Sequence, residues 1–137
     1  IVEYLDGVSG EPRLIPQAFS ERIEVRRWEA LGDGVAEATV LISHDYRKPA
    51  DKRESAAWYE KQRQKIHRSL AVMVRDLGDR EFCYGKTFTL ADVAAGYALG
   101  YLDQALPEFE WRKPYPKLSQ LAERLGARDS FRKTRPA

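Results

Sequence analysis

The residues best suited to chemistry in this chain are few and stand far apart. Cys83, the single cysteine, lies shortly before a glycine and a helix start, where a thiol pKa can be lowered. His44 and His67 are the two histidines, and neither has a second ligand at metal-binding spacing. The sequence has no glycine-rich phosphate loop and no nucleophile elbow, and nothing places a Ser–His–acid triad. We expect a structural cysteine, surface histidines, no metal site and no self-contained active site.

A second candidate group lies within the first of two long predicted helices. Asp33, Gly34 and Glu37 share a helix face that mixes acids with small residues. Gly32 and Gly34 weaken the helix and thin its surface at this point. The face is either solvated, with a tolerated kink, or a shallow site where a ligand approaches the backbone.

The stretch Phe82–Leu102 has the clearest local signal. Thr89 is a good N-cap, and Asp92 can return a hydrogen bond to the Thr89 N–H, which makes a capping box with Asp in place of Glu. Phe88 and Val93 flank the box at the positions of a hydrophobic staple. The helix that follows is apolar on all sides, so we expect it to be buried.

Two glycines stand inside this apolar helix, and each costs roughly 1 kcal/mol relative to alanine. Gly96 and Gly100 are therefore expected where neighbouring backbones pack closely. The run is shorter than the roughly 20 residues that a membrane span needs. A capped core helix of a globular domain is the favoured interpretation, and no membrane partner is expected.

The remaining pattern is helical throughout, and no segment alternates as a strand does. One long helix is predicted from a cap at Ser20 to about Tyr46, and a second from about Glu54 or Ser55 to Leu77. The fold class is therefore all-α: a bundle with two long antiparallel helices around a buried, capped central helix. Core stripes are expected at Trp28, Leu31, Val35, Ala38 and Ile42, at Ile66, Leu70, Met73 and Leu77, and at Leu118, Leu121, Ala122 and Leu125.

The chain of 137 residues fits one domain and carries 23 basic and 21 acidic residues, for a net charge of +2. The two signs are interleaved, whereas a nucleic-acid surface would gather positive charge on one face. We therefore expect no nucleic-acid partner. A single cysteine is typical of a reducing compartment, so we expect a cytoplasmic location.

The N-terminal residues indicate a junction between two domains. Residues 1–6 look like the end of a helix whose start is missing, and Ile1 is not a methionine. Residues 7–18 have the glycine and proline punctuation of a linker, and residues 19–137 form the helical domain. We expect the sequence to be part of a longer protein, with apolar surface exposed near residues 1–5 and Trp28 when the rest is absent.

The chain resembles the helical C-terminal domain of bacterial glutathione S-transferases over essentially its whole length. Phe82–Leu102, with Phe88-Thr-Leu-Ala-Asp92, is similar to the central helix of that family. Ile1–Leu5 resembles the end of the family's thioredoxin-like first domain, and Leu14–Pro16 resembles the interdomain linker. Arg27–Ala38 resembles the long first helix of the second domain, and Arg128–Pro136 the C-terminal turn. The capping box alone is a weak signal, but the ordered series is specific.

The resemblance implies a function that is divided between two domains. In the family, glutathione is the co-substrate and is bound mainly by the first domain, which also supplies the residue that engages the thiol. The helical domain supplies part of the pocket for a small hydrophobic electrophile. The resemblance therefore implies a transferase in the full-length protein, without a metal, and an inactive chain when the first domain is missing.

The resemblance also implies roles for particular residues. The electrophile pocket falls on Asp33, Gly34 and Glu37 of the first long helix and on Tyr101 of the central helix. Some bacterial members have a histidine near the position of Glu37 and a tryptophan near that of Tyr101, so this sequence departs from them there. Family members are homodimers that pack the two long helices near the partner's first domain.

Two further functions compete with the transferase. Trp58 and Tyr59 are adjacent and cannot both lie on one narrow core stripe, so one of them is expected to face a partner, and the resemblance makes both of them candidates for dimer contact. The same complete helical domain without a nucleophile also fits a non-catalytic protein-interaction module. A nucleic-acid binder that uses its arginines is the weakest of the three hypotheses.

Overall fold

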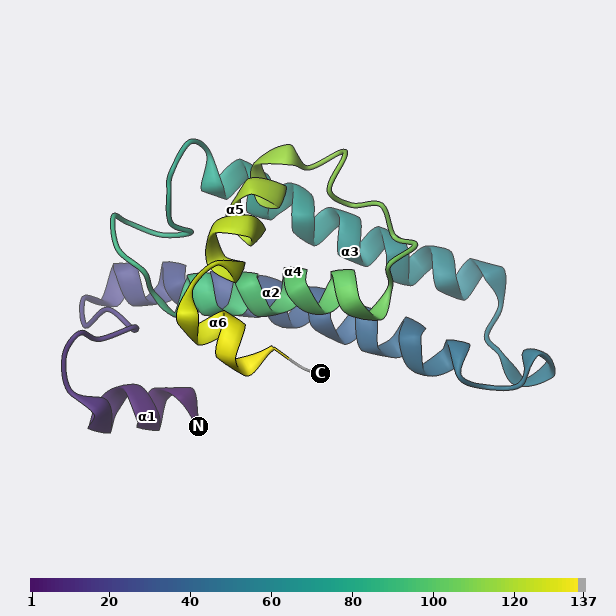
Figure 1. Ribbon diagram of the computed structural model, residues 1–137, viewed down its shortest axis with the longest axis horizontal. Coiled ribbons are helices and arrows are strands. Elements are labelled where there is room, and N and C mark those ends of the chain that lie inside the picture. The colour runs from purple at the N-terminus through teal and green to yellow at the C-terminus, as the bar shows by residue number, and fades with distance from the viewer. Residues whose placement is uncertain (136–137) are drawn as a thin grey trace.

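The computed structural model describes residues 1–135, which fold into helices and contain no strand (Figure 1). The all-α prediction is therefore confirmed. The expected C-terminal turn is helical, although Pro136 lies outside the described residues. The elements are α1 (Val2–Ser9), α2 (Phe19–Tyr46), a 3-10 turn η1 (Ala50–Lys52), α3 (Ala56–Leu77), α4 (Leu90–Ala105), α5 (Pro116–Gly126) and α6 (Asp129–Thr134).

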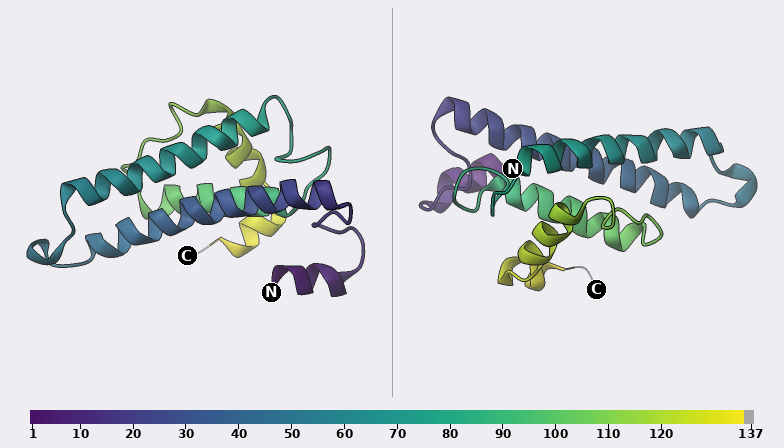
Figure 2. Two further views of the ribbon diagram at one scale, coloured as in Figure 1. Left: turned by 180° about the vertical axis from the view of Figure 1, so that it is seen from behind. Right: turned by 90° about the horizontal axis from the view of Figure 1, so that it is seen from above.

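The helices form three layers, with α4 in the middle. The two long helices α2 and α3 run antiparallel, and α4 runs beside α2 in the same direction (Figure 1). On the other side of α4 lie α5 and α6, as the view from above shows (Figure 2). The expected core stripes of α2, α3 and α5 are buried, except that Leu31 and Ala122 are half-buried.

The boundaries of the long helices follow the local sequence at three of the four ends. Ser55 accepts a hydrogen bond from the Trp58 N–H and caps α3, which ends at Gly78 with φ at 56°. The end of α2 at Tyr46 also agrees with the prediction. Its start does not: the backbone becomes helical at Phe19, so Ser20 lies inside the first turn and caps nothing.

The start of α4 is the predicted capping box. Asp92 Oδ2 accepts from the Thr89 N–H at 2.9 Å, and the Thr89 hydroxyl accepts from the Ala91 N–H at 3.3 Å. The second carboxylate oxygen of Asp92 accepts from the Cys83 N–H at 2.8 Å. Asp92 therefore caps the helix and also fixes the preceding loop.

The body of α4 is not buried on all sides, contrary to the prediction. One face has no neighbour within the described chain, so Tyr97 is 56% exposed. The two glycines differ. A Cβ on Gly96 would lie 2.6 Å from the ring of Phe131 on α6, so the close packing there is against a side chain and not against the expected backbone. A Cβ on Gly100 would meet nothing within 4 Å.

The N-terminal helix is longer than the sequence suggested. Helix α1 continues to Ser9, so the turn begins at Gly10 rather than at residue 7. The Asp6 carboxylate accepts from the Leu14 N–H at 2.6 Å, and the Leu14 carbonyl accepts from the Leu90 N–H at 2.9 Å. The linker is thus fixed to α1 at one side and to α4 at the other.

Candidate functional site

The α2 residues expected at the electrophile site lie on an outer face that turns toward α3. Asp33 and Glu37 are exposed, and Gly34 is half-buried. The Glu37 carboxylate lies 2.6 Å from Lys65 Nζ on α3, and this hydrogen bond lowers the pKa of Glu37. A Cβ on Gly34 would lie 3.8 Å from the Ser69 hydroxyl. The charge of Glu37 is therefore balanced locally, whereas Asp33 forms no ion pair within residues 1–135.

Gly32 does not thin this outer face, as the sequence suggested. It is buried against α4, where an added Cβ would lie 2.9 Å from the carbonyl oxygen of Ala94. Glycine lets the backbones of the two helices touch at this point. Its role is therefore to bring α2 and α4 together.

Tyr101 lies on the side of α4 that faces α2. It follows Ala94 by seven residues, or two helical turns, so it shares the face that touches Gly32. Since α2 and α4 run in the same direction (Figure 1), the part of α4 that follows Ala94 lies alongside the part of α2 that follows Gly32. Within the described chain, no hydrogen bond or ring contact joins Tyr101 to Asp33 or Glu37.

A second tyrosine belongs to this surface and was missed in the sequence. Tyr97 lies one turn before Tyr101, and their rings stack with centroids 6.0 Å apart and planes at 8°. Tyr97 is exposed and Tyr101 is half-buried. The signal that could have found the pair is a tyrosine at i and i+4 among small residues, which places both rings on one face.

The expected dimer contacts Trp58 and Tyr59 are both half-buried against the core of their own chain. The Tyr59 hydroxyl donates to the Asp45 carboxylate near the end of α2, and Lys48 Nζ lies 2.6 Å from the other Asp45 oxygen. The hydrogen bonds from Lys48 and Tyr59 lower the pKa of Asp45 to about 2. Burial and the bond to Asp45 raise the pKa of Tyr59 to about 12. Tyr59 therefore fastens α2 to α3, whatever its role toward a partner.

Cys83 is not an activated thiol. It is fully buried, and burial and then the nearby Asp92 charge raise its pKa well above the ordinary value. The lowered thiol pKa that its sequence position allowed is therefore not found. The buried environment favours the structural role that was also expected. No group of three or more His, Cys, Asp or Glu residues among residues 1–135 could hold a metal ion.

An apolar surface without a neighbour covers α1 and the start of α2. Glu3 of α1 forms ion pairs with Arg22 and Arg26 of α2, which fix the two helices side by side. Trp28 does not contribute to this surface, contrary to the prediction, because it is buried in the core. The exposed apolar side chains are Ile1, Val2, Tyr4, Leu5 and Val8 of the N-terminal segment and Phe19 and Ile23 of α2.

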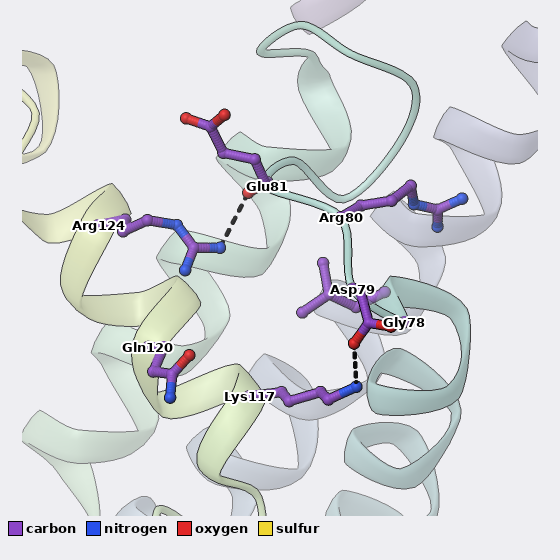
Figure 3. Close-up of a pocket in the computed structure, with 8 residues that line it drawn as sticks. Gly78, Asp79, Arg80, Glu81, Lys117, Gln120 and Arg124 are labelled. Atoms are coloured by element: carbon purple, nitrogen blue, oxygen red, sulfur yellow. Dashed lines mark hydrogen bonds and ion pairs between the residues drawn. The ribbon is translucent and has the colours of Figure 1, made fainter.

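A separate hollow of about 320 Å³ lies between α5 and the loop after α3 (Figure 3). Helix α5 contributes Lys117, Gln120 and Arg124, and the loop contributes residues 78–81, with the buried Leu77 beneath them. Lys117 Nζ lies 2.6 Å from Asp79 Oδ1, and Arg124 Nη2 donates to the Glu81 carbonyl at 3.0 Å. Most of the residues that line the hollow are charged or polar, and the hollow was not anticipated from the sequence.

No helix in the described part of the chain has the length and apolar character to cross a membrane. The site residues offer a balanced carboxylate, a free carboxylate and a stacked aromatic pair. Groups of this kind can bind and orient a ligand.

Comparison with known proteins gives a consistent result. A family profile described as "Glutathione S-transferase, C-terminal domain" matches residues 56–124. The chain is 34% identical over 136 residues to the GST-like protein YibF of Escherichia coli K12. The aligned region covers 99% of this chain and 66% of YibF.

Two solved glutathione S-transferases have closely similar structures. One, from Methylobacterium radiotolerans in complex with glutathione sulfonate, aligns with a TM-score of 0.91 and 39% identity over 98% of this chain and 63% of that one. The other, from Methylobacillus flagellatus with glutathione bound, aligns with a TM-score of 0.92 and 40% identity over 98% of this chain and 66% of that one. This chain therefore spans about two thirds of the length of the proteins it matches.

Proposed function

The chain belongs to the glutathione S-transferase family and forms its helical C-terminal domain, and from this premise we propose that the whole protein conjugates glutathione to small hydrophobic electrophiles. The observation that carries the proposal is the likeness, over nearly the whole chain, to two transferases solved with glutathione or glutathione sulfonate. In this proposal glutathione is a co-substrate, and no metal takes part.

The proposed division of labour rests on what this chain has and lacks. Its one thiol, Cys83, is buried and protonated, so it cannot serve as the nucleophile. The thiolate must then come from glutathione held by another part of the protein. The exposed apolar residues of α1 and the start of α2 fit a surface that such a part would cover.

We place the electrophile over the surface made by the middle of α2 and the open face of α4. The stacked rings of Tyr97 and Tyr101 give a flat apolar wall, and Gly100 leaves the approach to it open. Asp33 and Glu37, on the face of α2 that turns toward α3, are the proposed polar edge, and Lys65 already neutralises Glu37. The wall would hold the electrophile beside the thiolate and exclude water, so that the rate comes from proximity and thiolate stabilisation.

The proposal extends to assembly and location. The exposed parts of Trp58 and Tyr59 are the candidate contacts of a homodimer, and the protein is expected in the cytoplasm. An interaction module without catalysis is the second candidate, because the apolar surface of α1 could equally receive another protein.

One experiment separates the two functions. The full-length protein is incubated with glutathione and an aryl halide, and release of halide is followed against a reaction without protein. The transferase predicts turnover that saturates in both substrates. Binding to an immobilised glutathione resin without turnover of any electrophile would favour the interaction module.

A further inference from the structure

The hollow between α5 and the loop after α3 has its polar groups on one helix face. Lys117, Gln120 and Arg124 follow one another at spacings of three and four, so they project from the same side of α5 (Figure 3). The adjacent face of α5, about 100° round the helix, is fixed in the core by Leu118, Leu121 and Leu125. The three side chains are therefore presented by a firmly anchored element.

The facing loop is also held in place before any ligand arrives. Arg80 donates to the carbonyl oxygens of Asp76 and Cys83, and the Cys83 N–H donates to the buried Asp92. Arg124 joins the two walls through its bond to the Glu81 carbonyl. A hollow whose walls are already ordered costs a ligand little conformational entropy.

Several hydrogen-bond donors in the hollow are unused within the described chain. Gln120 makes no side-chain hydrogen bond there, and Arg124 uses only Nη2, which leaves Nη1 and Nε. The Glu81 carboxylate points away from the hollow, so it does not compete for these donors (Figure 3). The hollow thus has a surplus of donors and of positive charge on its α5 side.

We infer that this hollow binds a small anion bearing a carboxylate or phosphate group, a site separate from the electrophile surface. The planar fork of Arg124 suits either group, Gln120 adds a neutral donor, and Lys117 adds a second charge. A volume of about 320 Å³ suits a small molecule, and the charged side chains that line the hollow favour one that carries charge.

Asp79 competes with the anion for Lys117. Its side chain is 96% exposed and holds Lys117 at 2.6 Å in the structure described here. An entering anion takes over Lys117, and Asp79 turns outward into water. Removal of the Asp79 charge therefore strengthens anion binding, whereas removal of the Arg124 charge weakens it.

The test is an NMR titration of the protein that carries this chain, with inorganic phosphate and with citrate in separate series at constant ionic strength. The Gln120 side-chain amide is the reporter. We expect saturable shifts in at least one series, and the responsive series identifies the anionic group. Arg124→Gln weakens binding at least about tenfold. Arg68→Gln, the same change at an exposed α3 position outside the hollow, leaves it unchanged.

Asp79→Asn gives a second readout that does not depend on the Arg124 variant folding. It should bind the same anion several-fold more tightly than the unaltered protein. The proposal is overturned if neither anion shifts the Gln120 amide, if Arg124→Gln and Arg68→Gln bind alike, or if Asp79→Asn binds more weakly.

Discussion

Gly32 of α2 and Ala94 of α4 touch backbone to backbone: a methyl group on Gly32 would lie 2.9 Å from the Ala94 carbonyl oxygen. This contact sets how closely the first long helix approaches the central helix. It therefore also sets the distance between the two surfaces assigned to the electrophile, the outer face of α2 and the Tyr97–Tyr101 wall of α4.

Gly32→Ala should destabilise the protein, although alanine is the better helix former by about 1 kcal/mol. The added methyl group meets backbone that cannot move aside, so we expect a net loss of about 1–3 kcal/mol in the free energy of unfolding. Gly100→Ala is the matched control, because a methyl group there meets open space. It should stabilise by up to about 1 kcal/mol. If urea unfolding shows that both substitutions change the free energy of unfolding in the same direction, the close contact at Gly32 is refuted.

Asp92→Ala should cost more than a lost helix cap. The substitution removes the acceptor for the Thr89 N–H and also for the buried Cys83 N–H. A cap is worth about 0.5–2 kcal/mol and an unsatisfied buried donor about 1–3 kcal/mol, so we expect a loss of roughly 2–4 kcal/mol.

Asp129→Ala provides the comparison for Asp92, since Asp129 opens α6 but is exposed and caps nothing. Its unfolding free energy should stay within about 0.5 kcal/mol of the unaltered protein. If the two substitutions cost the same, the second role of Asp92 is wrong.

Asp45 should make the fold sensitive to acid. Its pKa is lowered from 3.8 to about 2, so its stabilisation is complete above about pH 4 and is lost as the pH falls through about 2. Asp45→Asn should be less stable at neutral pH and lose less on acidification over this range. Asp51→Asn, an exposed aspartate of η1, is the control and should follow the unaltered protein. If the free energy of unfolding, measured with urea, falls equally for all three proteins as the pH is lowered from about 4 to about 2, the role of Asp45 is contradicted.

Cys83 should be unreactive while the protein is folded. Burial removes it from reagents and raises its pKa, so little thiolate forms. A thiol-specific chromogenic reagent should label it only after urea is added. Rapid stoichiometric labelling in native buffer would mean that the loop opens readily or that the thiol is accessible.

The helices could be predicted because their signals are local. Thr89 and Asp92 specify the start of α4, Ser55 specifies the start of α3, and the apolar stripes follow the helical period. The start of α2 could not be found in this way, because the backbone turns at Ala18 without a capping side chain.

What could not be predicted depends on tertiary neighbours. Composition alone makes α4 a helix apolar on all sides, but only the fold shows that Tyr97 lies on an open face and is 56% exposed. Gly32 and Gly100 look alike in the sequence, yet one touches a backbone and the other faces open space. The polar hollow joins Asp79 to Lys117 across 38 residues, and no local pattern indicates that pairing.

The most direct test of the central claim is steady-state kinetics of Tyr101→Ala in the full-length protein. If this chain supplies the electrophile side, the KM for an aryl halide should rise at least about tenfold while the KM for glutathione stays unchanged. Tyr101→Phe, which keeps the ring that stacks on Tyr97, should retain the original values. A rise in the KM for glutathione alone, or no change in either constant, would contradict the assignment of this surface to the electrophile.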